Sequence, residues 1–145
     1  MSKKYAMNID IIIQHGYRQP LDIIDTFKLR WNILFPFRQF TDELLNGTGF
    51  DSIEQLTYHI MGRRHRESLG DNCLYISIGT ASSFIKVLEK IKNNTDRYIT
   101  EELLEHFGTD DPMAVLWDIA NVYMFFKKYL DLQATGEELV FRSWW

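Results

Sequence analysis

The stretch from Asp111 to Leu132, DPMAVLWDIANVYMFFKKYLDL, is the longest and most apolar segment of the chain. Asp111 is suited to cap a helix, because its side chain accepts an unpaired N–H, and Pro112 is suited to the first helical position, where an N–H is not needed. Turned at about 100° per residue, the apolar side chains cover most of the circumference. A helix of this kind lies at the centre of a fold, with other elements packed on more than one side.

The apolar residues of this helix form two groups around its axis. One group is Met113, Leu116, Trp117, Ala120, Tyr123, Met124 and Leu130, and the other is Val115, Ile119, Val122, Phe126 and Tyr129. Asp118 and Asn121 interrupt the apolar run well short of the roughly 20 residues that cross a bilayer. We therefore expect a helix inside a soluble fold and no membrane span.

Length and composition bound the class of protein. With 145 residues the chain fits a single globular domain, residues 1–145, and its 46% hydrophobic content argues against disorder. The single cysteine, Cys73, excludes an internal disulfide framework and a zinc site built from several thiolates. No apolar run near the N-terminus has the length of a signal peptide, so we expect a cytoplasmic protein.

We expect a mainly helical fold, a compact bundle around the central helix at about residues 111–133. Residues 4–15 have isoleucines at alternate positions, as in a strand, but the segment also fits a short helix, which we favour. Pro20 opens a further predicted helix that runs to about Phe35. The best strand is Cys73 to Gly79, which needs a partner. Leu139 to Trp144 and the isoleucine segment are the candidates, so a small sheet of two or three strands, within an α+β fold, is the alternative.

Further helices are marked by their first residues. Asp51-Ser52-Ile53-Glu54 has the form of a capping box, in which an acceptor at the start is matched by Glu three residues on, and its helix is expected to end at about Ser68. Ser82 or Ser83 begins another helix. Thr100 caps the segment EELLEHFG, which ends at its glycine.

The dense basic cluster of the chain is Arg63, Arg64 and Arg66, near the predicted end of a helix. Guanidinium groups form paired hydrogen bonds to phosphate oxygens, so the cluster is a candidate site for phosphate or a nucleic-acid backbone. Arginines at a helix C-terminus also offset its dipole and stay solvated, and this cluster lacks interleaved aromatic residues that stack on bases. The net charge of −4 disfavours nucleic acid and fits a basic protein partner.

Acidic residues gather between Asp96 and Asp118 against a single arginine. The candidate partner-binding residues among them are Glu101, Glu102, Glu105, Asp110 and Asp111. Such a surface steers a basic partner and raises its association rate, although some of these acids also suit helix starts. Trp144 and Trp145 are candidate anchors, because buried aromatic residues dominate the energy of protein interfaces.

The segment Gly49-Phe50-Asp51-Ser52-Ile53 resembles the Asp-Ser-Leu motif of acyl and peptidyl carrier proteins. In that family the serine at a helix start carries phosphopantetheine, so the resemblance implies attachment at Ser52. It covers about a dozen residues, from Asp42 to Leu56, and Ile53 stands in place of the usual leucine. Carrier domains are shorter four-helix bundles, and a capping box explains the same residues without a cofactor.

No pattern in the sequence identifies a reaction. The four histidines lack the spacing of metal ligands, and neither a glycine-rich phosphate loop nor a GxSxG elbow occurs. Asp118 and Asn121, one turn apart, are the best remaining pair for chemistry, because a partly buried carboxylate acquires a shifted pKa. We expect no catalytic residue, metal or cofactor, and a protein that is not an enzyme.

Size and charge favour a small acidic protein-binding domain that occupies a basic partner protein, as an inhibitor, an immunity or antitoxin-type protein, or an adaptor. The first alternative is a regulator that binds nucleic acid or a nucleotide through Arg63, Arg64 and Arg66. The second alternative is a carrier-like domain modified at Ser52. The sequence leaves the oligomeric state open.

Overall fold

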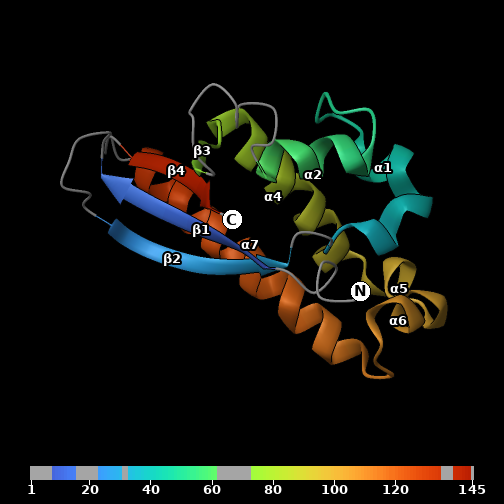
Figure 1. Ribbon diagram of the computed structural model, residues 1–145. Helices are drawn as coiled ribbons and strands as arrows, with labels where there is room; N and C mark the ends of the chain where they lie inside the picture. The colour runs from blue at the N-terminus through green and yellow to red at the C-terminus, as the bar shows by residue number, and fades with distance from the viewer. Residues whose placement is uncertain (1–7, 16–22, 31–32, 62–72, 135–138, 145) are drawn as a thin grey trace.

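The computed structural model describes residues 8–15, 23–30, 33–61, 73–134 and 139–144. Over these residues the chain is mainly helical, as the sequence predicts, and its helices adjoin one antiparallel sheet (Figure 1). The sheet has four strands, in the order β2-β1-β4-β3, where the sequence allowed two or three.

Helix α7, Pro112–Ala134, is the long central helix that the sequence predicts. Its start is capped by Asp111, whose Oδ1 accepts a hydrogen bond from the N–H of Met113 at 3.0 Å. One side of α7 packs against helix α4, Ile78–Asn93, and another packs against the sheet, where Phe125 stacks on Phe27 with the ring centroids 5.0 Å apart. The buried side chains of α7 are Val115, Ile119, Val122, Phe125, Phe126 and Tyr129.

The remaining side of α7 is open to solvent, although it is apolar. Met113, Trp117 and Met124 have exposed fractions of 62%, 68% and 66%. All of them belong to the first of the two apolar groups that the sequence places around the helix. The helix is therefore packed on two sides, as expected, but a third side presents large hydrophobic residues to water.

In the sheet, strand β1, Asn8–His15, lies between β2, Ile23–Arg30, and β4, Leu139–Trp144. Strand β3, Cys73–Tyr75, pairs with the other edge of β4, and each neighbouring pair of strands is antiparallel. Figure 1 shows α7 running along one face of β1 and β2, so the sheet and α4 enclose the buried sides of α7.

Two helix predictions are wrong. The segment 4–15, where we favoured a helix, contains β1, and the helix predicted from Pro20 to Phe35 is replaced by β2. Burial in β2 alternates as in a strand, since Leu29 is buried while Lys28 and Arg30 are exposed. Pairing with β1 and packing on α7 thus determine the strand conformation of a segment whose own pattern predicts a helix.

Helices α2 Ile53–Met61, α4 and α6 Glu101–Phe107 lie where the sequence predicts helices. A short helix that the sequence also predicts over residues 37–46 corresponds to η2 Phe35–Phe40 and α1 Thr41–Leu45, whereas α5 Thr95–Tyr98 was not predicted. Helix α4 begins earlier than expected because Ser77 caps it, accepting from the N–H of Thr80 at 3.1 Å. The capping box of α2 is shifted by one residue: Ser52 accepts from Gln55 N–H at 3.0 Å, and the Gln55 side chain accepts from Asp51 N–H at 2.7 Å.

Candidate functional site

The acidic residues singled out in the sequence lie on α6 and on the connection from α6 to α7. We call Glu101, Glu102, Glu105, Asp110 and Asp111 together the acidic corner. Helix α6 begins where Thr100 accepts from the N–H of Leu103 at 3.2 Å, and it ends at Gly108 in the left-handed conformation with φ 71°. Because Leu103 and Leu104 are buried, the glutamates of this short helix are left on its outer side.

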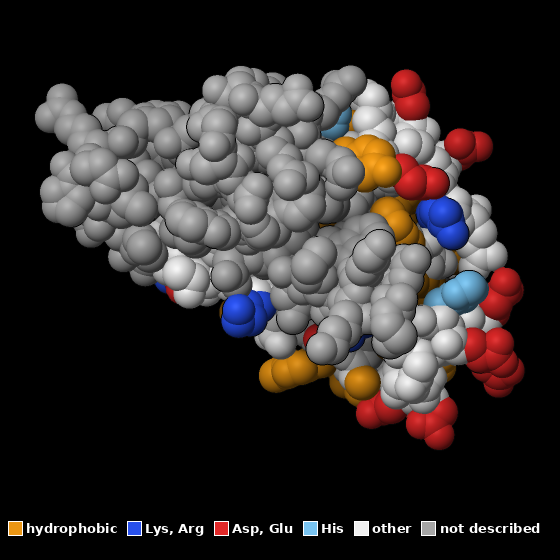
Figure 2. Space-filling model, viewed as in Figure 1, with side chains coloured by type: hydrophobic (Ala, Val, Ile, Leu, Met, Phe, Trp, Pro, Cys, Tyr) orange, Lys and Arg blue, Asp and Glu red, His pale blue; other side chains and the backbone are white. Residues whose placement is uncertain are grey.

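All five carboxylates of the acidic corner are exposed. None forms an ion pair with another residue in the described part of the chain. Among them, Asp111 caps the start of α7 by accepting the N–H of Met113. Figure 2 shows acidic side chains along the right-hand edge of the molecule, where Figure 1 has α1, α6 and the start of α7. The structure therefore brings together the five acids that the sequence predicts, on one solvent-facing corner.

A groove of about 310 Å³ marks one border of the acidic corner. Its lining residues are Phe35, Pro36, Arg38, Gln39, Glu102 and His106. Arg38 also pairs with Glu54 on α2, at 3.5 Å from Nη1 to Oε2. The negative surface thus ends at η2, whose Arg38 lines the groove.

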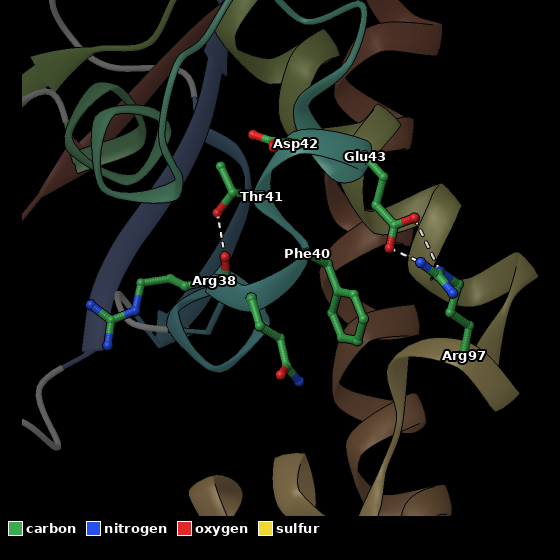
Figure 3. Close-up of a pocket in the computed structure, with 7 residues that line it drawn as sticks. Arg38, Phe40, Thr41, Asp42, Glu43 and Arg97 are labelled. Carbon is green, nitrogen blue, oxygen red and sulfur yellow. Dashed lines mark hydrogen bonds and ion pairs between the residues drawn. The ribbon is translucent and has the colours of Figure 1, made fainter.

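A second hollow, of about 520 Å³, lies beside this groove (Figure 3). Nε of Arg97 donates to both carboxylate oxygens of Glu43, at 2.9 and 3.0 Å, and this contact raises the pKa of Arg97 above its usual value. Figure 3 shows Arg38 and Arg97 on opposite sides of Phe40, with the guanidinium group of Arg97 at Glu43. The two guanidinium groups do not converge on one point, so the hollow lacks the forked cation pair that holds a phosphate.

Asp118 and Asn121, the pair considered for chemistry, line a hollow of about 300 Å³ between α7 and β2. The side chain of Asp118 is 52% exposed and lies 4.0 Å from Nη2 of Arg30. The expectation of a partly buried carboxylate is wrong here, because this side of α7 faces the rim of the sheet and not the core. A surface ion pair of this kind contributes little to stability or to acid-base chemistry.

Several predicted residues fall outside the region that the structure describes. Arg63, Arg64, Arg66 and Trp145 are among them, so the nucleic-acid alternative stays a prediction. Trp144 is the last residue of β4, in register with Asp10 and Cys73, and only its backbone is described.

The hydroxyl group of Ser52, the residue of the carrier alternative, has a structural partner. Its oxygen accepts the N–H of Gln55 and so caps α2. This cap accounts for the serine at that helix start without a cofactor.

No group of three His, Cys, Asp or Glu side chains within the described ranges is placed to hold a metal ion. None of the helices described in the structure has both the length and the hydropathy needed to cross a membrane. No protein-family model, curated protein or solved structure matches the chain.

One surface was missed by sequence reasoning, the open side of α7. We call Met113, Trp117, Ala120 and Met124 together the α7 stripe. Their positions fall within about 60° of one another around the helix axis, on the side away from Val122. Figure 2 shows hydrophobic side chains at the lower edge of the molecule, where α7 runs in Figure 1. The sequence did contain an indication of this surface, namely the two apolar groups around one helix. A small domain has few elements with which to cover both of them.

Proposed function

We propose that the chain is a protein-binding domain that takes up a basic partner through the acidic corner. The observation that carries the proposal is the set of five exposed carboxylates with no ion pair in the described structure. Of the other surface acids, Asp25, Glu54 and Asp131 already face a lysine or arginine. Asp42, Asp51 and Asp96 are exposed without an ion pair in the described structure, but they belong to three separate segments of the chain. Unpaired carboxylates on one corner leave a negative field that attracts a cationic surface.

A domain of this kind acts by occupying its partner. The partner's own site is covered while the complex lasts, as with an inhibitor, an immunity protein or an antitoxin, or the partner is held near a third protein, as with an adaptor. Exposed rim charges chiefly raise the association rate, so affinity also requires apolar anchors. Trp144 and Trp145 remain the predicted anchors at the end of the chain.

The test is capture of the partner from the native cells with an N-terminally tagged full chain, after nuclease treatment. We expect a basic protein at near-equal stoichiometry that is retained at low salt and lost from the variant Glu101→Lys, Glu102→Lys, Glu105→Lys. The matched control reverses Asp42, Asp51 and Asp96, which are also exposed and change the net charge equally. Retention of the same protein by both triple variants would contradict the role of the acidic corner.

A further inference from the structure

The α7 stripe and its two flanking charges have a spacing that reads the same from either end. Met113, Trp117, Ala120 and Met124 follow one another at intervals of four, three and four residues. Asp110, which lies just ahead of α7 and not within it, comes three residues before the first, and Lys127 comes three residues after the last. Alternating intervals of three and four are those of the a and d positions along the seam of a coiled coil.

This seam is uncovered in the described structure. Its three large apolar side chains are each almost two thirds exposed, and Ala120 between them is half-buried. The side chain of Lys127 is 48% exposed, and Asp110 is exposed as well. Large apolar residues aligned over three turns of one helix mark a contact surface more often than isolated ones do.

We propose that the α7 stripe joins two copies of this chain, whose α7 helices pack antiparallel about a twofold axis. Reversal of the palindromic spacing then sets Met113 against Met124 of the second copy and Trp117 against Ala120 of the second copy. It also brings Asp110 to Lys127 of the second copy. By symmetry each of these contacts occurs twice, so one short stripe supplies both halves of the interface.

The pairings are chemically complementary. The indole of Trp117 is the largest side chain of the stripe, and the methyl group of Ala120 is the smallest. Pairing each with the other across the axis places a large residue against a small one, so the seam is filled without a void. Flexible methionines adapt to the surrounding surface and make favourable contacts with aromatic rings. The carboxylate of Asp110 and the ammonium of Lys127 are opposite charges at each end of the seam.

The distribution of charge identifies a second copy as the occupant. The N-terminal end of the stripe has Asp110 and Asp111, and the C-terminal end has Lys127 and Lys128. A uniformly basic partner would meet repulsion at the lysines, and an acidic one at the aspartates, whereas a reversed copy matches both ends. Lys127 bonds to Asp131 at 2.6 Å and Lys128 bonds to Asp25 at 2.8 Å. Both are surface pairs, which cost little to rearrange.

The dimer is expected to be weak. Three helical turns from each copy form a contact smaller than a standard protein interface, so we expect a dissociation constant on the order of 100 µM. This inference does not rest on the proposed function, although Asp110 belongs both to the acidic corner and to the end of the seam.

The experiment is sedimentation equilibrium of the full chain at low ionic strength, from about 5 µM to about 1 mM. We expect a shift from monomer to dimer, and we expect Trp117→Asp to weaken association at least about tenfold. The matched control is Ile78→Asp on α4, which replaces another exposed apolar residue and should leave the dimer unchanged. A monomer at every concentration, or a dimer that tolerates Trp117→Asp, would overturn the proposal. Circular dichroism verifies that each variant is folded.

Charge exchange tests the antiparallel arrangement. Asp110→Lys alone and Lys127→Asp alone each place like charges together twice, so we expect each to weaken the dimer about three- to tenfold. The two changes in one chain restore opposite charges and should return the affinity toward that of the wild type. A double variant no tighter than the single ones would overturn the antiparallel register.

Exchanging the large and small residues of the seam distinguishes this register from non-specific hydrophobic association. Ala120→Trp sets two indoles against each other and should weaken the dimer, although it adds apolar surface. Combining it with Trp117→Ala restores one large and one small residue and should recover association. Stronger association of the Ala120→Trp variant would count against the proposal.

Discussion

The ammonium group of Lys90, on α4, lies 2.9 Å from the carbonyl oxygen of Asn46, the residue that follows α1. It also donates to the carbonyl oxygens of Glu43 and Leu44, at 3.0 and 3.1 Å. The last carbonyls of a helix have no partner within it. A single cation from α4 thus caps the C-terminal end of α1 and ties together two elements that are distant in sequence.

Replacing Lys90 with Met leaves the carbonyl groups of Glu43, Leu44 and Asn46 without this donor. We expect the free energy of unfolding to fall by about 2 kcal/mol, because hydrogen bonds to a charged group are among the stronger ones. The control is Lys86→Met, since Lys86 is exposed on the same helix and should change stability by less than about 0.5 kcal/mol. Urea denaturation measures both, and equal losses would contradict the cap.

The start of α2 tests the shifted capping box. Ser52→Ala removes the acceptor for the N–H of Gln55 and should lower stability by about 1 kcal/mol. Asp51→Ala should cost less than about 0.5 kcal/mol, because the contact at that residue uses its backbone N–H, which alanine retains. A larger loss at Asp51 than at Ser52 in chemical denaturation would restore the box as first read from the sequence.

The two sides of α7 differ in what a truncation costs. Phe126 is fully buried and meets the ring of Phe84 edge-on, with centroids 4.9 Å apart. We expect Phe126→Ala to lower the free energy of unfolding by about 3–5 kcal/mol through the cavity that it leaves. Met124→Ala, on the exposed side, should change it by less than about 0.5 kcal/mol when measured at low micromolar concentration, where a weak dimer dissociates.

Tyr123 titrates differently from an ordinary tyrosine. Its partial burial, and next its hydrogen bond to Glu89 at 3.1 Å, raise the pKa of the phenol above the usual value of about 10. The folded state then holds this proton more tightly than the unfolded state. The resulting stability is complete below about pH 10 and is lost as the pH rises through the folded pKa.

Ultraviolet titration of phenolate absorbance measures this shift, with Tyr123→Phe identifying the signal among the seven tyrosines. Glu89→Gln removes the carboxylate, and we expect the pKa of Tyr123 to move down toward that of an exposed tyrosine. An unchanged titration curve in Glu89→Gln would leave burial as the sole cause.

Sequence reasoning succeeded where neighbouring residues decide the structure. The bounds of α6 follow from Thr100 at its start and Gly108 at its end, and both roles depend on atoms within one turn of the chain. Asp111 fixes the start of α7 in the same way. The five acids of the acidic corner lie together for the same reason, since they are close in sequence, and their role in binding stays a prediction.

Distant contacts decide the rest. The alternation of Ile11 and Ile13 fits a strand, but a strand is stable only with partners. The partners of β1 are β2 and β4, which come before and after the helices that the structure describes. The exposure of Trp117 likewise depends on which elements reach α7. Periodicity shows that a helix has two apolar sides, but it does not show that only one of them is covered.

The central place of β1 in the sheet has a consequence for how the protein is made. Ile12 is paired with Arg142 on one edge and with Thr26 on the other. During synthesis β1 therefore lacks one of its two neighbouring strands until β4 has been made. Until then β1 has an open edge, on which another nascent chain can pair. We expect polypeptides arrested before residue 139 to depend on chaperones, and release of β4 from the ribosome to be the event that frees them.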